Sequence, residues 1–297
     1  MSTFNDLIED AQAILRGYVM AQDQSTYLTA GVDSDDLTWS VADASRLSPG
    51  RCEVGSELVY IDTFDTQNNQ ITIAPYGRGV DGSTAASHSS NAQVINNPRF
   101  PRHRIKQAIN ATINQVGSIG LFAVGTSTIT TVADDWSYEL PAATTRVIDV
   151  QYEHADDKWI QLRQWKYDPS IATTTHATGK ALVTGLLPGD RTLVVTYAKD
   201  PSELSADADV FATVTGLPES CRDVIVFGAC WRMLSAVGPG MLDALAISAA
   251  DLDTRKVQGQ EEANVSLQMY RSFTQRFNEE RAALLDRYQT PIHVTRF

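Results

Sequence analysis

The chain has 297 residues, of which 43% are hydrophobic and 20% charged, a composition that supports a sizeable core and excludes disorder of the whole chain. Its net charge of −12 excludes a protein that grips nucleic acid over most of its surface, because phosphate binding needs Lys and Arg. Three cysteines without a CxxC pair argue against a disulfide framework and favour a reducing compartment.

The first quarter of the chain changes from helical to strand periodicity. Apolar residues recur at helical spacing over residues 6–19, so we assign residues 1–25 to the N-terminal helix of a helical body. The helix carries acids where a secretory leader needs bases, and no apolar run approaches the roughly 20 residues of a membrane span, so we expect a soluble protein made in the cytoplasm. Alternating patterns then predict a small β domain over residues 26–97, with strands at 37–41, 57–61 and 70–73.

A glycine-rich loop ends this β domain at residues 77–88, with the sequence GRGVDGSTAASH. Its glycines match G-x-G-x-x-G in letters, but a nucleotide site needs a preceding strand and a helix directly after it. Here Ser, Ala, His and Asn follow, and we interpret the segment as a loop in which glycine supplies positive φ. No cofactor is expected, and no pair among the five histidines has metal-ligand spacing.

Residues 98–120 predict a second helix of the body, with Pro98 and Pro101 marking its entry. The segment contains no acid and has a basic cluster made of Arg99, Arg102, Arg104 and Lys106. We weigh inter-subunit pairing equally with a plain solvated helix start, and contact with DNA comes third.

Residues 121–210 are again dense in β-branched and aromatic residues and predict a β-rich insertion, a β-sandwich or barrel. Strands are expected at 126–132, 146–152, 158–165, 180–184 and 192–197. Trp136, Trp159 and Trp165 could line a sugar-binding face, although aromatic residues in strands more often lie in a core.

Residues 211–288 predict a C-terminal helical region: one helix from Pro218 to about 237, a break at 238–240, a short helix at 241–250 and a long one at 260–288. The long helix has a two-signed face that we expect between subunits, made of Arg271, Arg276, Glu279, Glu280, Arg281 and Arg287. Pro291 prevents helix beyond it, so residues 289–297 form an extended tail. Its alternation suits docking on another protein, and the docking residues are Thr290, Pro291, Ile292, His293, Val294, Thr295, Arg296 and Phe297.

The order of these elements predicts an α+β fold, a helical bundle assembled from distant segments and carrying two β-rich insertions. No catalytic constellation stands out. The adjacent acids Asp134 and Asp135 look solubilising, and there is no G-x-S-x-G. We therefore expect a structural protein and not an enzyme.

Three segments resemble one family. The loop at 77–88 resembles a "GxDGTxAAxH"-like turn of phage structural proteins, and the helix starts at 99–110 and 216–234 look like those of phage neck proteins. With the long helix and extended C-terminus that follow, the chain is similar to the head-to-tail adaptors of tailed bacteriophages, also called connector or neck proteins.

This resemblance implies a virion protein of the neck, made in the host bacterial cytoplasm, with no membrane association. It implies a homo-oligomeric ring, expected to be dodecameric, between the portal protein and a downstream tail or neck protein. It implies that the C-terminal segment docks on the portal. Genomic DNA would pass through a central channel during DNA ejection without sequence-specific binding, and an acidic wall would let the duplex slide.

Two other functions remain open. A tail or baseplate component would bind tail proteins and ignore the portal. A glycan-binding virion module would expose its tryptophans, and bacterial-surface sugars would quench their fluorescence.

Overall fold

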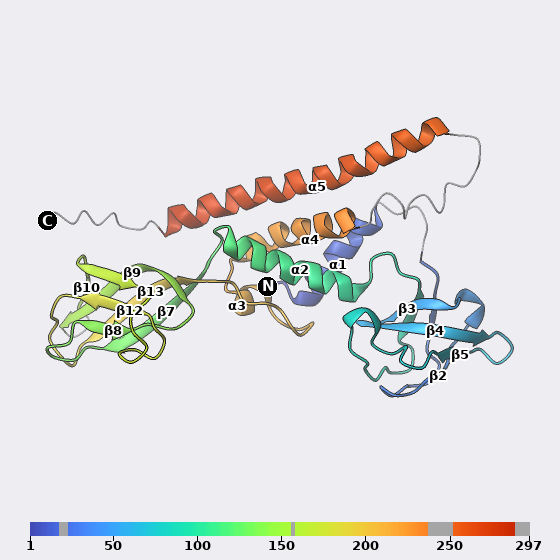
Figure 1. The fold of residues 1–297 in the computed structure, drawn as a ribbon, viewed down its shortest axis with the longest axis horizontal. Coiled ribbons are helices and arrows are strands. Elements are labelled where there is room, and N and C mark those ends of the chain that lie inside the picture. Colours follow the sequence, from blue (N-terminus) through green and yellow to red (C-terminus); the bar gives the residue numbers. More distant parts are fainter. Residues whose placement is uncertain (18–22, 156–157, 237–251, 289–297) are drawn as a thin grey trace. The chain divides into compact units, whose positions relative to one another are not determined.

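The computed structural model describes residues 1–17, 23–155, 158–236 and 252–288. These residues form two compact units (Figure 1). We call Asn5–Ala111 with Ile225–Ser272 the barrel unit, and Met1–Phe4 with Thr112–Val224 and Phe273–Phe297 the sandwich unit. The six segments proposed from sequence stay a prediction. No described helix is long and apolar enough to cross a membrane.

The barrel unit contains a six-stranded antiparallel sheet in the order β1-β6-β3-β4-β5-β2. Its two edge strands meet, because Thr29 N donates to Ser40 O at 2.9 Å and Ala42 N donates to Tyr27 O at 2.8 Å. The sheet therefore curls into a partly closed barrel. Its strands are β1 (Ser25–Tyr27), β2 (Thr38–Ser40), β3 (Gly50–Val54), β4 (Glu57–Asp65), β5 (Gln70–Ile73) and β6 (Gln93–Asn96).

The barrel closes around an apolar core supplied by the inward positions of its strands. Ile71 and Ile73 of β5 are buried while Gln70 and Thr72 are exposed, which is the period of two that a one-sided strand requires. Trp39 is wholly buried, and its Nε1 donates to Asp36 O at 2.9 Å, so its polar atom is satisfied inside the core.

Helices from distant parts of the sequence pack together in the barrel unit. They belong to α1 (Phe4–Arg16), α2 (Arg102–Ser118), α4 (Arg222–Ala236) and α5 (Leu252–Arg287). Cys230 Sγ of α4 lies 3.7 Å from Ala11 O of α1, and the rings of Trp231 and Tyr270 join α4 to α5 with centroids 5.0 Å apart. The predicted helical body built from distant segments is thus confirmed.

Two antiparallel sheets share one core in the sandwich unit. Their orders are β10-β9-β13-β7 and β11-β12-β8. Tyr138 and Leu182 of one sheet lie in the same buried cluster as Val150 and Val195 of the other. The strands are β7 (Ala123–Thr130), β8 (Ser137–Glu139), β9 (Thr144–Ala155), β10 (Lys158–Gln161), β11 (Trp165–Asp168), β12 (Ala181–Thr184) and β13 (Thr192–Lys199).

The single strand predicted at 158–165 is wrong. The chain leaves β10 after Gln161 and enters β11 at Trp165, and the two strands lie in different sheets. All four residues of β10 are exposed, so its sequence has no inward-facing positions that would mark where this strand ends and β11 begins.

The helices of the sandwich unit include α3 (Phe211–Thr215) and the last turns of α5. The start of the chain is fixed beside α3, because Phe4 N donates to Asp209 O and Phe211 N donates to Ser2 O, both at 2.8 Å. The helix predicted from Pro218 begins as a 3-10 turn, Glu219–Cys221, before α4. The predicted break at 238–240, helix at 241–250 and tail at 289–297 lie outside the described residues.

Candidate functional site

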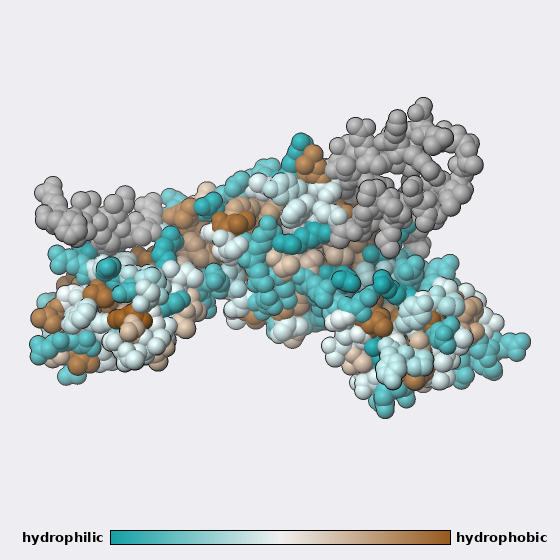
Figure 2. Space-filling view, viewed as in Figure 1, coloured by the Kyte–Doolittle hydropathy of each residue, from teal (hydrophilic) through white to brown (hydrophobic). Residues whose placement is uncertain are grey.

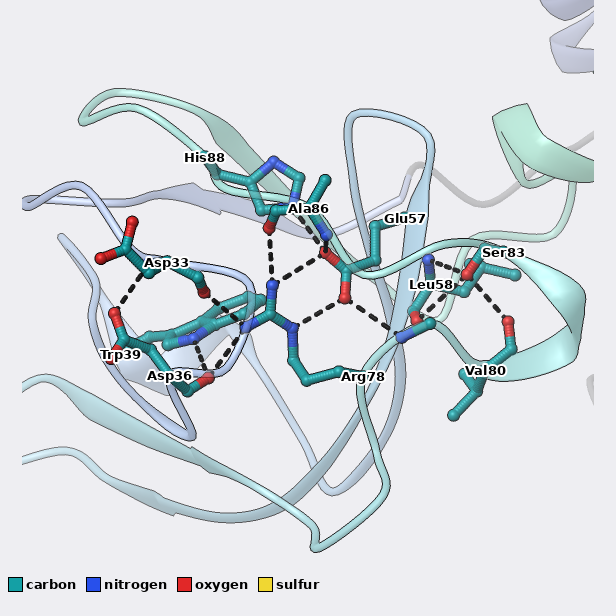
Figure 3. A network of polar contacts seen from close by, with 11 residues as sticks. Asp33, Asp36, Trp39, Glu57, Leu58, Arg78, Val80, Ser83, Ala86 and His88 are labelled. Atoms are coloured by element: carbon teal, nitrogen blue, oxygen red, sulfur yellow. Dashed lines mark hydrogen bonds and ion pairs between the residues drawn. The ribbon is translucent and has the colours of Figure 1, made fainter.

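The most extensive polar cluster surrounds Glu57, the first residue of β4 (Figure 3). Its side chain is wholly buried, and the glycine-rich loop supplies its partners. Arg78 donates from Nε to Oε1 at 2.7 Å and from Nη2 to Oε2 at 3.0 Å, and His88 Nε2 lies 2.8 Å from Oε2. The backbone N–H groups of Gly79 and Ala86 each donate to the carboxylate at 3.1 Å. Five donors therefore converge on one buried acid.

Arg78 extends the network to a second loop. Its Nη1 donates to Asp33 O at 2.8 Å and to Asp36 O at 2.9 Å, and its Nη2 also donates to Ala86 O at 2.7 Å. The guanidinium carbon lies 4.8 Å from the centre of the Trp39 ring, within cation–π range. One arginine therefore joins the loop before β2, the start of β4 and the glycine-rich loop.

The electrostatics of Glu57 fit an acid that is ionised at neutral pH. Burial raises its pKa, but the hydrogen bonds from His88 and Arg78 and the N–H of Ala86 outweigh burial and lower the pKa to about 2. The side chains of Arg78 and His88 are only 7% and 11% exposed. The donors around Glu57 already bind its carboxylate, and the buried side chains leave no surface on which a substrate could bind. We therefore call Glu57, Arg78 and His88 the structural lock of the barrel.

The predicted glycine loop is confirmed, and two of its glycines are required. Gly79 has a φ of 62°, a value that side chains disfavour. A Cβ at Gly77 would lie 2.8 Å from Ala74 O. A 3-10 turn at Val80–Gly82 follows in place of the α-helix of a nucleotide site. Among the residues that the structure describes, no group of three or more His, Cys, Asp or Glu could hold a metal ion.

The basic cluster lies at the start of α2, and some of its members are engaged within the chain. Arg102 N donates to Glu53 Oε2 at 2.8 Å, and the Arg102 side chain contacts Asn5. Arg99 donates a backbone hydrogen bond to Asp23. Arg104 is exposed and Lys106 half-buried. Arg104 is therefore the member most available to a neighbour, and the role of the cluster stays a prediction.

Glu53 of β3 lies beneath this helix start and is 4% exposed. Burial raises its pKa to about 7, while the Arg102 N–H and the charges of Arg102 and Arg16 act in the opposite direction. The folded protein therefore holds the proton more tightly than the unfolded chain. Stability from this group is complete below pH 4.5 and is lost as pH rises through about 7.

We expect Glu53→Gln to stabilise the protein at pH 8, because the amide avoids a buried charge and still accepts from Arg102 N. The gain is at most about 3 kcal/mol, the equivalent of the pKa difference, and it should vanish near pH 4.5. Urea unfolding at both pH values measures it. An equal effect at the two pH values would show that Glu53 is not a buried titrating group.

Part of the predicted inter-subunit face of α5 forms ion pairs within the sandwich unit. Arg276 Nη1 donates to Glu279 at 2.7 Å and its Nη2 donates to Glu280 at 3.3 Å, and Asp223 of α4 lies 3.9 Å away. Glu280 also accepts from Ser220 Oγ at 2.5 Å. The remaining predicted residues are exposed, and they are Arg271, Arg281 and Arg287. Their role between subunits stays a prediction.

The tryptophans considered for sugar binding do not lie on one sheet. Trp136 precedes β8, and the exposed Trp159 lies on β10 of the other sheet. Trp165 is partly buried against the shared core. The predicted portal-docking residues at 290–297 lie outside the described residues.

A family model described as SU10 adaptor protein matches residues 84–295, well over half of the chain. The match begins in the glycine-rich loop and includes α2, the strands of the sandwich and the helices after them. A search of the curated proteins finds no match.

Proposed function

Since the chain belongs to the SU10 adaptor protein family and is a structural adaptor of the phage virion, we propose that it forms a ring between the head portal and the tail. The ring is dodecameric, and genomic DNA passes through it during ejection. The family match over residues 84–295 carries this proposal.

The described chemistry supports an assembly role. The largest polar cluster is closed and saturated by its own chain, as expected of a structural lock. Exposed cations on α5 and Arg104 on α2 are available to neighbouring copies. Many copies of one modest contact, closed by rotational symmetry, reach high stability through multivalency.

The adaptor binds two different proteins, one on each side of the ring. Residues 290–297 dock on the portal protein. A downstream tail or neck protein binds the remaining free surface. The net charge of −12 suits a channel wall that repels the DNA backbone and does not hold it.

Immunogold electron microscopy of intact virions tests this position. We expect an antibody against the protein to label the head–tail junction. Label at the distal end of the tail would contradict the proposal and support a tail or baseplate component. Label along the fibres, with tryptophan quenching by bacterial-surface sugars, would support the glycan-binding alternative.

A further inference from the structure

An exposed apolar tip lies at one end of the sandwich unit. Three large side chains form it: Val132 is 58% exposed, Trp136 is 55% exposed and Leu186 is 68% exposed. Figure 2 shows hydrophobic side chains on the surface of this unit among hydrophilic ones. Single exposed apolar residues need no explanation, but a group of three that includes a tryptophan indicates an interaction site.

Hydrogen bonds join the two loops that carry these residues. Thr184 N donates to Trp136 O at 2.9 Å, which places the start of the Leu186 loop beside Trp136. Asp190 N donates to Thr131 O at 2.9 Å, and Thr131 Oγ1 donates to Pro188 O at 2.7 Å. The loop that carries Val132 and Trp136 is therefore tied to the loop that carries Leu186.

The backbone of the tip is closely packed. A Cβ at Gly189 would lie 2.9 Å from Ala133 N, so the two loops touch at this point. Leu187 packs against the shared core of the sandwich, while its neighbour Leu186 points to solvent. The tip thus presents apolar side chains from an ordered scaffold, and such preorganisation lowers the entropy cost of binding.

Charges around the tip select the class of partner. The same two loops carry the acids Asp134, Asp135 and Asp190, and the cation Arg191 follows the second loop. A rim of this sign disfavours the anionic surface of a membrane, which attracts basic segments. It favours a protein whose apolar pocket is bordered by Lys or Arg.

We infer that the apolar tip docks into a cation-rimmed apolar pocket of the tail protein that joins the neck. This inference rests on the proposed function, which assigns the portal to the C-terminal segment and leaves the tail for another surface. Trp136 and Leu186 are the anchors, and the acidic rim sets orientation.

The experiment uses the full chain assembled on portal rings of the same virion, with tails purified from that virion as the probe. Trp136→Ser and Leu186→Ser remove the anchors at exposed positions. Trp159→Ser is the matched control, because it removes an exposed tryptophan from the same unit outside the tip. We expect each tip variant to assemble on the portal normally and to bind tails about tenfold or more weakly. The control should bind tails as the wild type does.

Unchanged tail binding by both tip variants would overturn the inference. Loss of portal assembly by the tip variants alone would also overturn it and would place the tip between copies or on the portal. Binding of the wild-type protein to phosphatidylglycerol vesicles that Trp136→Ser abolishes would assign the tip to a membrane. A wild-type protein that ignores the portal would instead contradict the proposed function itself.

Discussion

Replacing Glu57 with alanine is expected to destabilise the barrel by about 3–5 kcal/mol, because the change leaves Arg78 buried without its ionic partner. The Arg78 side chain is 7% exposed, so water cannot replace the carboxylate. Hydrogen exchange of residues 57–61 in the full chain measures the opening free energy of β4. Glu57→Gln keeps the shape without the charge and should give an intermediate loss.

An exposed ion pair of the same barrel provides the control. Asp43 and Arg46 lie 3.2 Å apart with side chains 44% and 62% exposed, and such pairs contribute about 1 kcal/mol or less. Arg46→Ala should therefore change exchange little, and it keeps the hydrogen bond by which Asp43 caps the 3-10 turn at Ser45 N. Equal losses for Arg46→Ala and Glu57→Ala would contradict the assignment of Glu57 as the structural lock.

The pH dependence of this lock follows from the low pKa of Glu57. The folded pKa of about 2 lies below the usual glutamate pKa of 4.5, so the stability from Glu57 is complete above pH 4.5 and is lost as pH falls toward 2. Glu53 acts in the opposite direction over a higher range. The free energy of unfolding of the wild type should therefore fall both below pH 4.5 and as pH rises through about 7. Substituting Glu57 should remove the loss at low pH, and substituting Glu53 should remove the loss at high pH.

Deleting residues 289–297 is expected to weaken portal binding on the order of 100-fold or more, because each copy in a ring loses its docking segment and the losses multiply through avidity. The fold should persist, since α5 ends at Arg287 and its buried residues precede the deletion. Surface plasmon resonance on immobilised portal rings measures the affinity, and hydrogen exchange over α5 checks the fold.

Two finer variants test whether the alternation of the tail matters. Ile292→Ser with Val294→Ser removes the apolar positions, while Thr290→Ser with Thr295→Ser changes polar positions of the same segment. We expect the first pair to reproduce much of the loss and the second to bind normally. Full portal binding by the deletion would place the portal contact elsewhere in the chain.

Periodicity predicted the elements with long, one-sided patterns. Residues 260–288 predicted a long helix, and Met269, Phe273, Phe277 and Leu284 of α5 are buried as that pattern requires. Strands β4 and β5 of the barrel had the same clarity at 57–61 and 70–73. The short strands β1 and β6 each bury only one residue, so their sequences show no period of two and did not predict them.

The polar lock could not be predicted because its partners are distant in sequence. Arg78 and His88 lie 21 and 31 residues after Glu57, and nothing local marks that acid as buried. An arginine and a histidine inside a glycine-rich loop were the available signal. Glu53 gave no signal either, because its burial depends on the start of α2 lying over β3.

The mass of the purified protein, measured by light scattering alone and after mixing with portal rings of the same virion, tests the central claim most directly. We expect a complex with portal whose added mass equals twelve copies of a chain of 32.5 kDa. If no mass is added, or if binding does not saturate at twelve copies, the protein is not a ring-forming adaptor docked on the portal.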